Sequence, residues 1–64
     1  MNGRVSTFDA GRGLGEITAA DGTVYPFHCT QIADGTRLID VGALVRFVLI
    51  PRLGRFEAGQ IAAA

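Results

Sequence analysis

The dipeptide Asp21-Gly22 stands between two short runs of apolar and polar residues, Leu14 to Thr18 and Thr23 to His28. Asp-Gly is among the strongest short-range hairpin signals, because both central residues of a tight primed turn need a positive φ. Alternating residues of a strand point to opposite faces of the sheet. The sequence therefore predicts an antiparallel hairpin here, and any fold of the chain has to include it.

Three further runs have the composition of strands. They cover Gly3 to Phe8, Leu44 to Ile50 and Arg55 to Ile61. A glycine-rich turn at residues 9–13 separates the first run from the hairpin, and Pro51 to Gly54 forms the turn between the last two. No segment of the chain keeps a helical period. The pattern predicts short strands punctuated by turns.

The alternation fades between residues 29 and 42. Thr30 to Ile32 is predicted to make one helical turn with Thr30 as its cap, and residues 34–36 have loop composition. Five short strands with a longer connection between the third and the fourth suit a small barrel of the OB type. A chain of 64 residues has room for one domain. We therefore expect an all-β protein, a five-stranded antiparallel OB-fold barrel in which residues 1–64 form a single domain.

The composition limits the classes of function. Six arginines balance six acidic residues, and without lysine the formal net charge is zero, whereas nucleic-acid modules usually carry a basic excess. Cys29 has no second thiol for a disulfide or a metal site, so we predict no metal and no cofactor, and a reducing compartment. No signal peptide is visible, and charges interrupt the longest apolar stretch, Val45 to Leu53. We expect a cytoplasmic protein.

Two motifs carry a family resemblance. Residues 12–17 read Arg-Gly-Leu-Gly-Glu-Ile and residues 25–30 read Tyr-Pro-Phe-His-Cys-Thr. They resemble the nucleic-acid-binding strands of the bacterial cold-shock domain, which usually read Lys-Gly-Phe-Gly-Phe-Ile and Val-Phe-Val-His-Phe-Ser. Weaker matches follow in order from Gly3 to Ile61. The resemblance implies an OB barrel of the cold-shock type that binds single-stranded RNA or DNA.

The chain departs from that family on one face. In the family, an exposed Trp and several Phe, with a His and a Lys, form the platform on which bases stack. The platform positions that have changed type are occupied here by Ser6, Thr7, Leu14, Glu16, Pro26 and Cys29. Phe8 and His28 remain, and Arg12 stands for the Lys that opens the motif. Because each stacked base is worth roughly 1–3 kcal/mol, the resemblance implies weak binding with little sequence preference.

Two hypotheses follow from these residues. In the first, single-stranded nucleic acid binds to a site formed by Phe8, Arg12, Leu14, His28 and Arg37. In the second, the barrel is a protein-interaction module that has lost nucleic-acid binding. Its surface for a partner or a second copy would be formed by Leu14, Pro26, Leu44, Val48 and Ile50. Enzymatic activity is not expected, because no nucleophile–base pair or paired carboxylates emerge.

Overall fold

The computed structural model describes residues 1–35 and 38–64. Its strands are β1 (Asn2–Asp9), β2 (Leu14–Ala19), β3 (Val24–His28), β4 (Leu44–Arg52) and β5 (Arg55–Ala63), and one 3-10 turn, η1 (Cys29–Gln31), follows β3. The five strands form one antiparallel sheet in the order β3-β2-β1-β4-β5. The predicted all-β class and the five predicted strands are confirmed.

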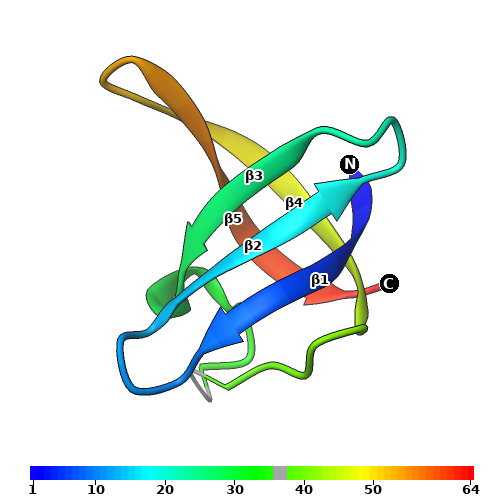
Figure 1. Cartoon of the computed structure of the whole chain (residues 1–64), viewed down its shortest axis with the longest axis vertical. Helices are drawn as coiled ribbons and strands as arrows, with labels where there is room; N and C mark the ends of the chain where they lie inside the picture. Colours follow the sequence, from blue (N-terminus) through cyan, green and yellow to red (C-terminus); the bar gives the residue numbers. More distant parts are fainter. Residues whose placement is uncertain (36–37) are drawn as a thin grey trace.

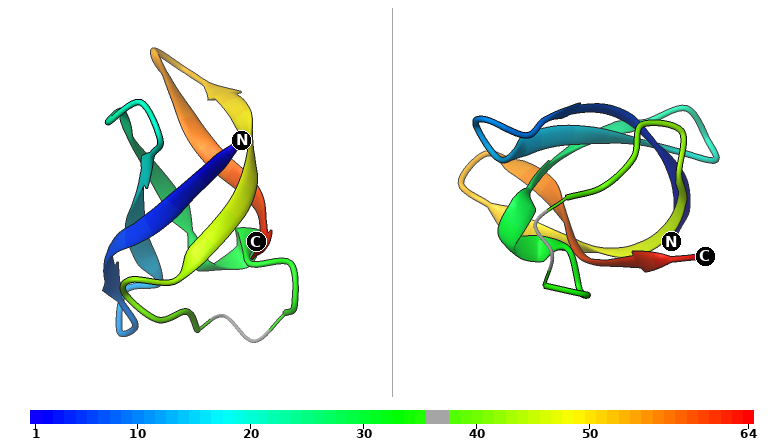
Figure 2. Two further views of the ribbon diagram at one scale, coloured as in Figure 1. Left: turned by 90° about the vertical axis from the view of Figure 1, so that its right-hand side faces the viewer. Right: turned by 90° about the horizontal axis from the view of Figure 1, so that it is seen from below.

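The sheet coils around one interior. β1, β2 and β3 lie in front of β4 and β5 in Figure 1, and the view from below in Figure 2 shows the strands encircling the core. Within the described residues no ladder joins the edge strands β3 and β5, so the sheet is open there. A single parallel bridge between Ile32 and Ile61 ties the segment after η1 to β5, and the Ala33 N–H donates to the Ile61 carbonyl at 2.7 Å.

A bulge at Ser6 changes which side chains of β1 face the interior. The pairing of β1 with β2 shifts between Val5 and Thr7, so Ser6 is an extra residue. Its Oγ donates to the backbone carbonyl of Glu16 at 3.1 Å. An extra residue reverses the alternation of the strand. Val5 and Phe8 therefore both face the core although they are three positions apart.

A second bulge has the same effect in β5. Gln60 adopts a φ of 49° where β5 shifts its register against β4. Its N–H donates to Oε1 of Gln31 on η1 at 3.3 Å. Ala58 and Ile61 lie on either side of this shift, and both are buried.

The two largest buried side chains are Phe27 and Phe47. Phe8 stacks on Phe27 with ring centroids 5.9 Å apart, and Tyr25 packs at a tilt on Phe47 at the same separation. The buried core is formed by Val5, Ile17, Ala19, Phe27, Ile32, Val45, Phe47, Ala58 and Ile61. Val45 and Phe47, two positions apart on β4, both face this core.

The predicted hairpin is present, but its turn is of another type. The Gly22 N–H donates to the Ala19 carbonyl at 2.9 Å, and the Ala19 N–H donates to the Thr23 carbonyl at 2.8 Å. Gly22 has a φ of 89°, whereas Asp21 stays at negative φ and accepts from the Thr23 N–H through Oδ1 at 2.9 Å. This is a three-residue loop, which needs positive φ only at its last position. The expectation of two positive φ values was wrong.

Replacing Gly15 by alanine should lower the free energy of unfolding by roughly 1–3 kcal/mol. A Cβ built there would lie 2.6 Å from Cζ of Phe27 and 2.6 Å from the backbone oxygen of Thr7. Gly11→Ala is the control, because its Cβ would meet only Asp9 Oδ1, at 3.5 Å. Urea unfolding measures both variants, and equal midpoints for Gly15→Ala and the wild type would contradict this packing.

Candidate nucleic-acid interface

β1, β2 and β3 present one outer face, away from the core (Figure 1). Leu14 on β2 lies opposite Asp9 on β1 and opposite His28 on β3. All three are exposed, and Leu14 keeps 46% of its surface accessible. The pairing therefore brings the two predicted site residues Leu14 and His28 together, side by side on adjacent strands.

A second row crosses the same face two residues further along β2. Glu16 lies opposite Thr7 on β1 and Pro26 on β3. Thr7 Oγ1 lies 3.4 Å from Glu16 Oε1 and is placed to donate to it. The row opens into a hollow of about 300 Å³. The hollow is lined by Thr7, Leu14, Gly15, Glu16, Pro26, Phe27 and Arg55.

The ring of His28 is oriented by the turn that follows it. His28 is the N-cap of η1, and its Nδ1 accepts from the Thr30 N–H at 3.4 Å and lies 3.1 Å from Thr30 Oγ1. The prediction that Thr30 is the cap was wrong, because His28 is the residue with extended backbone before the turn. In the neutral ring an accepting Nδ1 leaves the proton on Nε2. Nε2 is therefore the donor that His28 offers.

Arg12 lies in the turn between β1 and β2. Its N–H donates to the backbone carbonyl and to Oδ1 of Asp9, both at 3.2 Å, and Gly13, with a φ of 68°, leads the chain into β2. The side chain is exposed, and within residues 1–35 and 38–64 its guanidinium makes no ion pair. We call the outer face of β1, β2 and β3 the β1–β3 face. An unpaired cation therefore stands at the end of this face where His28 lies.

The structure does not bring Phe8 together with these residues. Phe8 pairs with Gly15, whose neighbours Leu14 and Glu16 point outward, so its side chain lies on the core side of the sheet. It is half-buried, and its ring is parallel to that of Phe27 within 2°. Sequence reasoning missed the reversal at the Ser6 bulge.

Arg37, the fifth predicted site residue, lies outside the described residues. Of the other arginines, Arg4 donates to the Gly42 carbonyl at 3.2 Å, and Arg46 is exposed on β4. Neither lines the hollow over Glu16. Arg55, a residue that the sequence did not suggest, does line this hollow.

Arg55 starts β5 and is held by an acidic neighbour. Its Nη2 lies 2.8 Å from Oε2 of Glu57, and Nε of Arg52 lies 3.3 Å from Oε1 of the same carboxylate. The Arg55 hydrogen bond is the largest effect that lowers the pKa of Glu57 below its ordinary 4.5; partial burial opposes it, and Arg52 and the charges of both arginines assist. Glu57 thereby orients the side chain that lines the hollow.

The residues predicted to form a partner surface on β4 differ in exposure. Leu44 and Val48 keep 58% and 43% of their surface accessible. Ile50 is half-buried, because it lies over Gly59, where a Cβ would overlap its side chain. The hypothesis of a partner surface needs Ile50 to be substantially exposed, and this was wrong. Gly59 on β5 has no side chain, so the Ile50 side chain packs against that strand.

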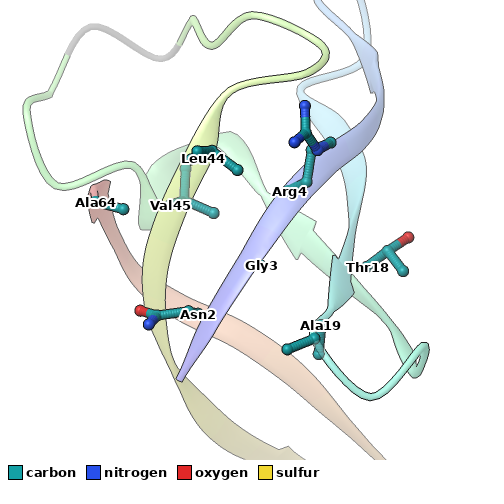
Figure 3. A pocket seen from close by; sticks show the side chains of 9 residues that line it. Asn2, Gly3, Arg4, Thr18, Ala19, Leu44, Val45 and Ala64 are labelled. Atoms are coloured by element: carbon teal, nitrogen blue, oxygen red, sulfur yellow. The ribbon is translucent and has the colours of Figure 1, made fainter.

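Leu44 also borders the hollow shown in Figure 3. This hollow, of about 480 Å³, crosses β4, β1 and β2 where Gly3 carries no side chain. Its labelled residues are Asn2, Gly3, Arg4, Thr18, Ala19, Leu44, Val45 and Ala64. Asn2, Arg4 and Thr18 are its polar side chains, and glycine and apolar residues form the rest of the lining.

Comparison with known proteins assigns no family. No protein-family model matches the chain, and no curated protein is significantly similar to it in sequence. None of the described segments is a helix with the length and apolar character needed to cross a membrane. In the same residues no group of three or more His, Cys, Asp or Glu side chains is placed to hold a metal ion. The site is therefore judged on its own geometry.

The ion pairs of Glu57 should make the free energy of unfolding depend on pH in the acidic range. Because the folded-state pKa is lowered, their contribution is present above about pH 4.5 and is lost as the pH falls through the lowered pKa. Glu57→Gln should cost up to about 1 kcal/mol near neutral pH and nothing in strong acid. Urea unfolding across this range tests the difference. Glu16→Gln, which breaks no ion pair within the described chain, is the control, and parallel curves for Glu57→Gln and wild type would contradict the assignment.

Proposed function

We propose that this chain is an OB-type protein similar to the cold-shock family that binds single-stranded RNA or DNA weakly. Two features of the fold support the barrel type: β1 pairs with both β2 and β4, and the edge strands β3 and β5 approach each other. The motifs of residues 12–17 and 25–30 support the family. Residues 14–17 of the first motif lie on β2 and residues 25–28 of the second lie on β3, the strands that carry the binding face in the resemblance.

The observation that carries the proposal is the grouping of Arg12, Leu14 and His28. Arg12 lies in the turn before β2, Leu14 on β2 and His28 at the end of β3, and the three share one exposed end of the β1–β3 face. An arginine contacts phosphate or stacks on a base, an imidazole donates to phosphate or stacks, and a leucine offers apolar contact. This grouping suits backbone contacts with limited stacking.

The charges on the face decide the strength of binding. Asp9 and Glu16 stand on the same surface and repel phosphates. One imidazole replaces a platform of aromatic rings, each of which would be worth roughly 1–3 kcal/mol per stacked base. We therefore expect a dissociation constant near the millimolar range, about 4 kcal/mol of binding free energy.

An NMR titration of the protein with oligo-dT and oligo-U in low salt should shift the amide signals of Arg12, Leu14 and His28. Affinity should fall as salt rises, because phosphate contacts release counterions. Arg12→Gln should weaken binding several-fold, while Arg46→Gln, with the same charge change on β4, should leave it within twofold. Absence of localised shifts at millimolar oligonucleotide would overturn the proposal.

A second candidate function is supported by the exposure of Leu44 and Val48. Both stand on the outer face of β4, on either side of Arg46, and Leu44 lies opposite Arg4 on β1. Exposed apolar side chains that adjoin one another mark interfaces. A net charge of zero gives little repulsion between copies of this chain. In this alternative the occupant of the surface is a second copy.

Val48→Thr should change the free energy of unfolding by less than about 0.5 kcal/mol and shift a self-associating sample toward monomer, because the side chain is exposed. Ile50→Thr is the contrasting variant. It places a hydroxyl at the half-buried position over Gly59 and should cost roughly 1–3 kcal/mol. Thermal melts beside sedimentation velocity separate the effects. A large drop in midpoint for Val48→Thr without a change in mass would mean that Val48 is core.

A further inference from the structure

The hollow over Glu16 is lined by a carboxylate, that of Glu16, and by a guanidinium, that of Arg55, and the two do not form an ion pair in the described structure. Glu16 is exposed in the middle of the β1–β3 face, and Arg55 reaches the same hollow from the start of β5. Within the part of the chain that the structure describes, no ion pair joins them, and Arg55 is held by Glu57 instead. The rest of the lining is Thr7, Gly15 and the apolar side chains of Leu14, Pro26 and Phe27. A ligand there would meet one charged acceptor and one charged donor beside apolar surface.

The carboxylate of Glu16 is mostly unused. Thr7 Oγ1 is its hydrogen-bond partner in the described structure, through Oε1 at 3.4 Å. An ionised carboxylate is only an acceptor and has room for about four hydrogen bonds on its two oxygens. The group that binds to it must therefore donate, and two adjacent donors would fit its two oxygens best.

The common nucleobases of RNA and DNA differ in the hydrogen-bond donors that they offer such a carboxylate. Guanine presents two neighbouring donors on its Watson–Crick edge, N1–H and the N2 amino group, with the acceptors O6 and N7 beyond them. Uracil and thymine present one donor between two carbonyls, and cytosine and adenine present an amino group beside an acceptor nitrogen. We propose that the hollow is a base pocket that selects guanine, with Glu16 accepting from N1–H and N2 and Arg55 donating to O6 or N7.

This inference rests on the proposed single-strand binding, because only an unpaired base exposes its Watson–Crick edge. The proposed pocket also explains why a carboxylate, that of Glu16, stands on a face that binds phosphates, although its charge repels them. The hollow is an open depression of about 300 Å³, so a base could enter it edge-on from solvent. Glu16 thus lowers the affinity for nucleic acid in general and raises the selectivity at one position of the strand.

Fluorescence anisotropy with a short labelled oligo-dT, and with versions that carry one central dG, dI, dA or dC, tests the pocket. The dG version should bind the wild-type protein at least about fivefold more tightly than oligo-dT. Deoxyinosine lacks the N2 amino group, so the dI version should lose most of that advantage. The dA and dC versions should bind no better than oligo-dT.

Two variants separate the preference for guanine from the general effect of removing a negative charge. Glu16→Gln should bind oligo-dT more tightly, because one repulsive charge is gone, and should lose the preference for dG. Asp9→Asn removes the same charge from the same face but lies outside the hollow, so it should raise the affinity for oligo-dT and keep the preference. An NMR spectrum of each variant verifies that it is folded.

The outcomes distinguish the two proposals. Equal affinity of the wild type for the dG and dT oligonucleotides, or a dG preference that survives in Glu16→Gln, would overturn the guanine pocket and leave single-strand binding intact. A preference lost equally in Asp9→Asn would also overturn it, because the effect would then be one of charge alone. Failure of the protein to bind any of the oligonucleotides would overturn single-strand binding and the pocket with it.

Discussion

The rest of the structure depends on the close approach of Phe27 to β2 at a position that has no side chain. Gly15 pairs with Phe8 on one side and with Phe27 on the other, and the two rings stack on the core side of the sheet. Any side chain at Gly15 would overlap Phe27. This contact sets the register of three strands, and the register in turn directs Leu14 and Glu16 outward.

Placing both aromatic rings inside has a consequence for the outer face. The interior gains the stacked pair Phe8 and Phe27, and the exposed surface keeps His28 as its one aromatic ring on the Leu14 row. What remains there is small, apolar or charged. The surface therefore suits a few directed hydrogen bonds better than a continuous stack of bases, and the proposed role of Glu16 is of that kind.

The residues of the candidate site differ in how much they depend on contacts between distant parts of the chain. Arg12 and His28 are positioned by their own turns, through Asp9 and Thr30 respectively, so their placement needs little of the remaining fold. Arg55 belongs to a hairpin at the other end of the chain and is oriented by Glu57. The hollow forms only when that hairpin reaches the β1–β3 face, since its lining combines the two.

The sequence by itself determined the all-β class, the five strands and the positions of the turns between them, because alternation and turn composition involve only neighbouring residues. It did not reveal that Phe8 faces the core, because the bulge at Ser6 depends on pairing with β2. Nor did it reveal that Ile50 lies over Gly59 or that Arg55 reaches the hollow. These placements join residues that are far apart in the chain or on different strands, so only the tertiary structure, through packing and strand register, decided them.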